Sequence, residues 1–263
     1  MKKLFKYGLK LWSINTESYR KEAIRLYKEG LFDFIELYTV PGSLDTLSEW
    51  KKLDMPFIIH GPHYAHGMNF ANKNNFEKNM KLYEETKTFA DSLNAEHIIF
   101  HPGTGGFIRE TASQVNQIDD ERILIENKPY KALPVMKVDF CTGSTPEEIR
   151  HLQRRTKAGF CLDIGHAIAA ANSFKMDFMK YTEKFIELTP QMYHLSDTDI
   201  EAETDYHYNF GKGNMDLEKI IRLIPENSSV TIETKKASSE NLDDFIEDIE
   251  VLTDTSSKIL AKK

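Results

Sequence analysis

The chain of 263 residues, with 40% hydrophobic residues, 29% charged residues and a formal net charge of −7, has the composition of a soluble globular protein. No window approaches the roughly 18 uninterrupted apolar residues that a membrane span needs, and Lys6 and Lys10 interrupt any apolar core of a leader segment. These features exclude a membrane partner and predict a cytoplasmic protein, which we expect to be a monomer. The net negative charge argues against general affinity for nucleic acid. Cys141 and Cys161 are too few for a disulfide framework and are expected to be free thiols.

Short apolar runs alternate with segments of helical spacing along the chain. Strands are predicted at residues 7–12, 32–38, 56–60, 97–101, 123–126, 159–163, 191–195 and 228–233. Helices are predicted at 18–29, 44–53, 75–93, 145–155, 177–188, 216–223 and 241–252, with a further short helix at 110–117. Strand and helix alternating eight times is the pattern of a (β/α)8 TIM barrel, an α/β fold, here expected as one domain over residues 1–263.

Residues 128–144 form the longest stretch without a clear period. They follow the fifth predicted strand, which places them at the carboxyl end of the barrel strands. Active-site loops of TIM barrels lie at that end. This loop is therefore expected to border the functional site.

Side chains of metal-ligand type gather at the ends of the predicted strands. They are His60, His101, Glu126, Asp163, His166, His194, Asp205, His207 and Glu233. Because the strands of a barrel end around one cavity, residues far apart in the sequence are expected to meet at one mouth.

Each of these residues also has an ordinary structural explanation. A lone histidine at the end of an apolar strand is usually a hydrogen-bonded core residue. Asp163 could cap a helix beside a surface His166, and Glu126 and Glu233 could be salt-bridge partners. Burying so many imidazoles and carboxylates in one cavity would nevertheless be costly without a cation. The set as a whole therefore predicts a polynuclear metal site.

The ligand types narrow the choice of metal. Imidazole and carboxylate without thiolate suit zinc or manganese, and five histidines favour zinc. About three zinc ions would outweigh the four carboxylates of the set, so the site would carry net positive charge and attract an anion.

Several motifs resemble those of the endonuclease IV family of apurinic-site nucleases, within the xylose-isomerase-like barrel superfamily. The motifs are FHPGTG with His101, LIENK with Glu126, GFCLDIGHAIAA with Asp163 and His166, MYHLSD with His194, DYHYNFGKGN with Asp205 and His207, and VTIET with Glu233. The resemblance covers about residues 56–234 and extends to all nine candidate ligands.

The resemblance implies three zinc positions. One would be held by His60, His101 and Glu126; a second by Glu126, Asp163, His194 and Glu233; a third by His166, Asp205 and His207. It further implies a zinc-dependent phosphodiesterase that hydrolyses the DNA backbone at abasic sites by a metal-bound hydroxide, with Glu126 as the bridging catalytic residue. The expected partner is DNA containing abasic sites or a phosphorylated small molecule.

The loops depart from the family. Residues 39–45, after the second strand, contain no Arg that could enter a base stack. After the third strand, His63, Tyr64, His66 and Phe70 could stack on bases or could form a packed aromatic loop. Lys128, Lys131 and Lys137 could meet phosphates or could form a solvated surface.

A second function is also open. Glu36 has no metal role in the endonuclease pattern and resembles the strand-two Glu of sugar isomerases and epimerases of the same superfamily. Such an isomerase, acting on a sugar or sugar phosphate, would use a single divalent metal on Glu126, Asp163, His194 and Glu233. It has no need of His101, Asp205 and His207 together, and those residues favour the hydrolase. A barrel kept as a metal-dependent binding protein would need an intact site that is closed to substrate.

Overall fold

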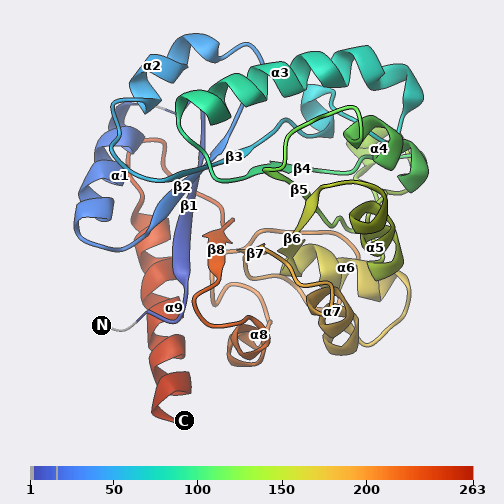
Figure 1. Ribbon diagram of the computed structural model, residues 1–263. Helices are drawn as coiled ribbons and strands as arrows, with labels where there is room; N and C mark the ends of the chain where they lie inside the picture. Colours follow the sequence, from blue (N-terminus) through green and yellow to red (C-terminus); the bar gives the residue numbers. More distant parts are fainter. Residues whose placement is uncertain (1–2, 16, 263) are drawn as a thin grey trace.

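The computed structural model describes residues 3–15 and 17–262, and within them eight parallel strands close into a barrel in sequence order (Figure 1). The strands are β1 Lys6–Trp12, β2 Phe34–Tyr38, β3 Phe57–His60, β4 Ile98–Phe100, β5 Ile123–Glu126, β6 Gly159–Asp163, β7 Met192–Leu195 and β8 Ser229–Ile232. The predicted TIM barrel is confirmed, and every predicted strand is present.

Helices surround the barrel (Figure 1). They are α1 Glu17–Lys28, α2 Leu47–Trp50, α3 Phe76–Ser92, α4 Ile108–Val115, α5 Pro146–Arg155, α6 Ile164–Ser173, α7 Phe178–Ile186, α8 Leu217–Leu223 and α9 Asp243–Ala261. Short 3-10 turns are η1 Leu44–Thr46, η2 Tyr64–His66, η3 Lys73–Asn75 and η4 Pro134–Met136. Among the described residues, no helix is long and apolar enough to cross a membrane.

Three helical segments differ from the expectation. The pattern did not predict α6, because its run of Ile and Ala is buried on all sides from Ile164 to Ala171 and so lacks an amphipathic period. Helix α9 was expected to end at residue 252 but continues to Ala261, with Ser256 and Ile259 buried in its last turns. The predicted helix at 44–53 is divided into η1 and α2.

An apolar layer fills the interior of the barrel. A cluster of six buried side chains, one from each of six consecutive strands, consists of Phe34, Ile58, Ile99, Leu124, Cys161 and Met192. On β1 the equivalent place is taken by Gly8, where a Cβ atom would lie 2.3 Å from the Phe34 ring. This layer closes the barrel below the site. Both cysteines are free, as expected, and the structure shows that both are buried.

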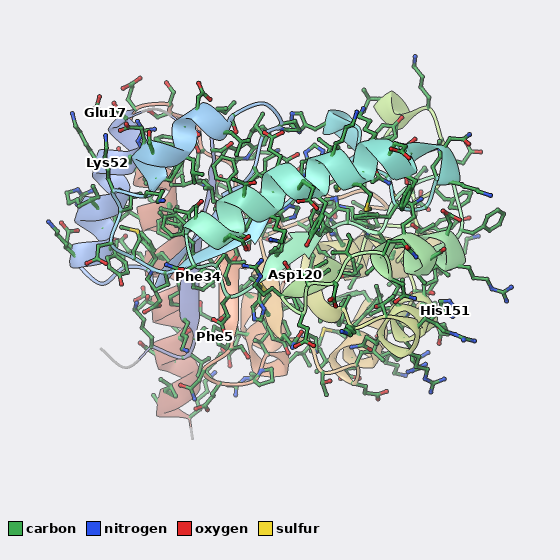
Figure 2. The ribbon with its side chains drawn as sticks, turned by 45° about the horizontal axis from the view of Figure 1, so that its top comes forward. Phe5, Glu17, Phe34, Lys52, Asp120 and His151 are labelled. Atoms are coloured by element: carbon green, nitrogen blue, oxygen red, sulfur yellow. The ribbon has the colours of Figure 1, made fainter. Side chains whose placement is uncertain are left out.

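A polar layer lies two residues further along every strand. Its members are Lys10, Glu36, His60, His101, Glu126, Asp163, His194 and Glu233, and we refer to them together as the polar layer. Because side chains alternate between the two faces of a strand, residues two apart share the barrel interior. The polar layer is therefore at the carboxyl ends of the strands. In Figure 2, Phe5, Phe34 and Asp120 mark the opposite end, where β1, β2 and β5 begin.

Candidate metal centre

Glu126 lies at the centre of the candidate ligands. Its Oε2 atom is 3.1 Å from His60 Nε2, 3.2 Å from His101 Nε2 and 3.4 Å from His194 Nδ1. Ligand atoms bound to one tetrahedral zinc ion are roughly 3.3 Å apart, because each lies at about 2.0–2.2 Å from the metal. The spacing around Glu126 therefore suits a carboxylate shared between metal positions.

Four histidines use one ring nitrogen to donate to a protein oxygen. His60 Nδ1 donates to Gly61 O at 2.7 Å, His166 Nδ1 to Asn127 O at 2.9 Å, His207 Nδ1 to Glu233 O at 2.9 Å, and His194 Nε2 to Glu36 Oε2 at 2.9 Å. Each bond fixes the tautomer and leaves the other nitrogen as an electron-pair donor facing a carboxylate. Histidines that bind metals are held in this way.

Two buried atoms at the centre make no hydrogen bond of good geometry in the described part of the chain. They are Glu126 Oε1, which lies 2.9 Å from His166 Nδ1, and His194 Nδ1, which lies 3.3 Å from Glu233 Oε1. Buried polar atoms normally find a partner, because an unpaired one retains its desolvation cost. A divalent cation between these ligands would satisfy both atoms, so the residues fit the implied metal.

His166, Asp205 and His207, which we call the outer group, form a second set of ligand atoms within 4.8 Å of one another. Asp205 Oδ2 lies 3.4 Å from His166 Nε2 and in close contact with His207 Nε2. His207 has a left-handed backbone with φ 48°, which is uncommon for a residue other than glycine and frequent at functional sites.

Asp163 connects the barrel to the outer group. Its Oδ1 accepts the backbone N–H of His166 at 2.7 Å and so caps α6, as the structural alternative proposed. His166 is 3% exposed, however, and is therefore not a surface residue. Asp163 groups with Glu126 and His166, whereas His194 and Glu233 group with Glu36. The expected assignment of Asp163 to the metal position of His194 and Glu233 stays a prediction.

Lys10 and Glu36 complete the polar layer on the two strands without a predicted ligand. The Lys10 ammonium forms ion pairs with Glu36 and Glu233, and Thr231 Oγ1 donates to Glu36 at 2.6 Å. Burial alone would raise the pKa of Glu36, but the charges of His194 and Lys10 lower it to about 2. The sequence pattern did not identify Lys10 or Thr231, although the two-residue spacing between interior positions could have done so.

The loop lysines have different environments. Lys128 Nζ lies 3.0 Å from His166 Nε2 and 4.0 Å from Glu126 Oε1, with its side chain 12% exposed, so it belongs to the site. Lys131 is exposed and pairs with Glu203 at 2.7 Å, and Lys137 is exposed.

The aromatic side chains of the loop after β3 also have two different environments. His63, Tyr64 and His66 line a cavity of about 880 Å³ that also reaches His101 and the outer group. Phe70 is fully buried against Phe100 and is a core residue. The alternative of a packed loop is therefore correct for Phe70, while the other three side chains face the cavity.

A closed parallel barrel with candidate imidazole and carboxylate ligands at its carboxyl end defines the class as a TIM-barrel protein with a candidate metal site. The sequence profile described as "Xylose isomerase-like TIM barrel" matches residues 30–255, and the chain belongs to this family. The superfamily's members are enzymes, with endonucleases, epimerases and isomerases among them. No protein of curated function matches.

Solved structures with the same fold differ in activity. A D-tagatose 3-epimerase-like protein is 18% identical, with 98% of this chain and 99% of that chain covered and a TM-score of 0.74. Endonuclease IV from Thermus thermophilus is 16% identical, with 96% and 99% covered and a TM-score of 0.65. The IOLI protein with a bound zinc atom is 16% identical, with 98% and 99% covered and a TM-score of 0.65. At these identities the likeness shows the fold alone.

Proposed function

We propose that the chain is a metal-dependent hydrolase of phosphate esters. We call Glu126, Asp163, His194 and Glu233 the deep ligands. The observation that carries the proposal is the presence of two further ligand sets beside them: His60 and His101, which group with Glu126, and the outer group, whose His166 groups with Glu126 and Asp163. A single metal on the deep ligands would be enough for an isomerase. The additional buried carboxylates need cations to compensate their charge, and the additional imidazoles can bind those cations. A site with several cations suits a phosphate substrate, which is an anion.

The chain's own residues would hold and orient the ions. Glu126, His60 and His101 would bind one, His194 and Glu233 with Glu126 a second, and the outer group a third. When bound, the ions supply a nucleophile from water at neutral pH and stabilise charge on the phosphate and the leaving oxygen. Lys128, beside His166, adds an ammonium group that can contact a phosphate oxygen.

The resemblance to endonuclease IV names a specific ester, the DNA backbone at an abasic site. The test is incubation of the zinc-loaded protein with a duplex oligonucleotide that carries a synthetic abasic site, beside a generic phosphodiester, bis(p-nitrophenyl) phosphate. We expect hydrolysis of a phosphodiester at some zinc or manganese concentration. If neither substrate is cleaved under any of these conditions, the hydrolase proposal is wrong.

Metal analysis of protein purified without chelator provides the second test. The hydrolase proposal expects about three zinc ions per chain, with manganese as a possible substitute. A single ion per chain, retained by Glu126, Asp163, His194 and Glu233, would support the alternative function, a sugar or sugar-phosphate isomerase or epimerase. The buried Glu36 favours this alternative, because it resembles the strand-two Glu of those enzymes.

A further inference from the structure

The loop of residues 128–144, which we call the arm, crosses the mouth of the barrel and is attached on three sides. Tyr64 in η2 donates its hydroxyl to Met136 O at 2.6 Å. Thr142 N donates to Gly103 O at 3.1 Å, after β4, and Lys131 pairs with Glu203 at 2.7 Å, after β7. These three contacts fix the position of the arm relative to the loops after β3, β4 and β7.

The arm borders the cavity of about 880 Å³ described above. Its size is within the range of about 300–1,000 Å³ that is typical for sites of small ligands. One wall is formed by His101 and the outer group, the other by apolar side chains of the arm, Leu133, Val135 and Met136. The cavity therefore has a polar end at the candidate metals and an apolar end at the arm.

The polar end is suited to an anion. Lys128 Nζ lies 3.0 Å from His166 Nε2, within the part of the wall that carries the outer group. The apolar end is suited to an organic group, since Val135 is 77% exposed and Leu133 44% exposed although both are large and hydrophobic. Exposed apolar side chains that line a cavity commonly contact a ligand.

We infer that the substrate is a small-molecule phosphate ester, with its phosphate at the outer group and Lys128 and its apolar or aromatic part beside Leu133, Val135 and Met136 of the arm. This inference rests on the proposed hydrolase function and narrows it from phosphate esters in general to compact ones. The attachments of the arm to η2 and to the loops after β4 and β7 narrow the approach to this cavity, so we expect a compact ester to reach it more readily than a continuous duplex.

The arm can be shortened without disturbing its base. Lys131 and Phe140 are partners in an antiparallel bridge, so an Asn-Gly turn can replace residues 132–139 directly. In the natural chain we expect kcat/KM for bis(p-nitrophenyl) phosphate to exceed that for the abasic duplex. In the shortened chain, KM for the small ester should rise about tenfold with kcat changed far less, because the apolar wall is lost. An unchanged KM, or a natural chain that prefers the duplex, would overturn the inference.

A point substitution makes the same test if the shortened chain does not fold. Val135→Asp places a carboxylate on the exposed apolar wall and should raise KM by a similar factor. Met176→Asp is its matched control, since Met176 is 42% exposed and is not among the side chains that line the cavity. Equal KM values for the two variants would count against the inference.

Binding separates the inference from the proposed function. If neither ester is hydrolysed, the hydrolase proposal fails, and calorimetry of phenyl phosphate with the zinc-loaded protein then decides on the cavity. Binding that is weakened about tenfold by Val135→Asp and unaffected by Met176→Asp supports the cavity as a site for compact phosphate esters. Absence of binding, or binding insensitive to Val135→Asp, overturns it.

Discussion

The polar layer and the outer group differ in what holds their side chains. The polar layer takes one residue from each strand or, for His101 and Glu233, from the position directly after it. Most of its members are buried, with Glu36 and His194 at 0% exposure. The outer group comes from α6 and from the loop after β7, and its His207 side chain is 35% exposed. The strands fix the first set as part of the barrel, whereas the second depends on loop conformation.

This difference bears on the choice between the two candidate functions. The four deep ligands Glu126, Asp163, His194 and Glu233 would serve a hydrolase and an isomerase equally. Only the additional ligands favour the hydrolase, and two of them, Asp205 and His207 of the outer group, lie in the loop after β7. The chemistry that distinguishes members of this fold is thus expected in the loops, which can vary without altering the barrel.

The residue shared by several ligand sets should have the largest effect. Glu126→Gln removes the charge of the carboxylate whose Oε2 lies 3.1–3.4 Å from three imidazole nitrogens and replaces one of its two oxygens with an amide nitrogen. We expect phosphodiester hydrolysis to fall on the order of 10³-fold and bound zinc to decrease. Circular dichroism should show the fold retained. Wild-type turnover in this variant would mean that Glu126 is not a bridging ligand.

Removing the outer group should separate the two regions. Asp205→Asn is expected to abolish one metal position and to reduce hydrolysis by about 10²-fold, because the amide cannot supply the charge between His166 and His207. The ions bound by the polar layer should remain, as measured by metal analysis after dialysis. His151→Ala, on α5, is the matched control and should change neither value. Loss of all bound metal in Asp205→Asn would show that the two regions are not independent.

A substitution of Glu36 tests whether this residue positions the candidate ligand His194. Glu36→Gln weakens the hydrogen-bond acceptor for His194 Nε2 and removes the ion pair with Lys10. The affinity for the ion proposed at His194, Glu233 and Glu126 should therefore fall about 10- to 100-fold. The measurement is zinc retention against a graded series of chelator concentrations, with Thr231→Val expected to show a smaller loss. If Glu36→Gln binds zinc as tightly as the natural chain, Glu36 does not position His194.

A substitution in the scaffold should leave both regions unchanged. Thr145 accepts the backbone N–H of Glu148 and forms a capping box at the start of α5. Thr145→Ala is expected to lower the free energy of unfolding by about 1 kcal/mol. Denaturant titration measures this loss, and metal content should not change. A changed metal content would mean that the start of α5 influences metal binding, contrary to this prediction.

The barrel and the nine candidate ligands could be predicted from the order of residues along the chain. Strand periodicity, and the position of each histidine or carboxylate at the end of an apolar run, are local features that depend on few neighbours. The helix α6 could not be recognised, because a helix buried on all sides has no polar face to reveal its period.

The grouping of the candidate ligands, in contrast, follows from the closed barrel and could not be read from the chain alone. Lys10, Glu36 and Thr231 come together from β1, β2 and β8, and no sequence spacing relates them before the barrel closes. The same holds for the arm, whose attachment to Tyr64 is made across 72 positions of sequence. Side-chain types follow from local sequence, but the distances between them are set by closure of the barrel and by its loops, which bring remote segments into contact.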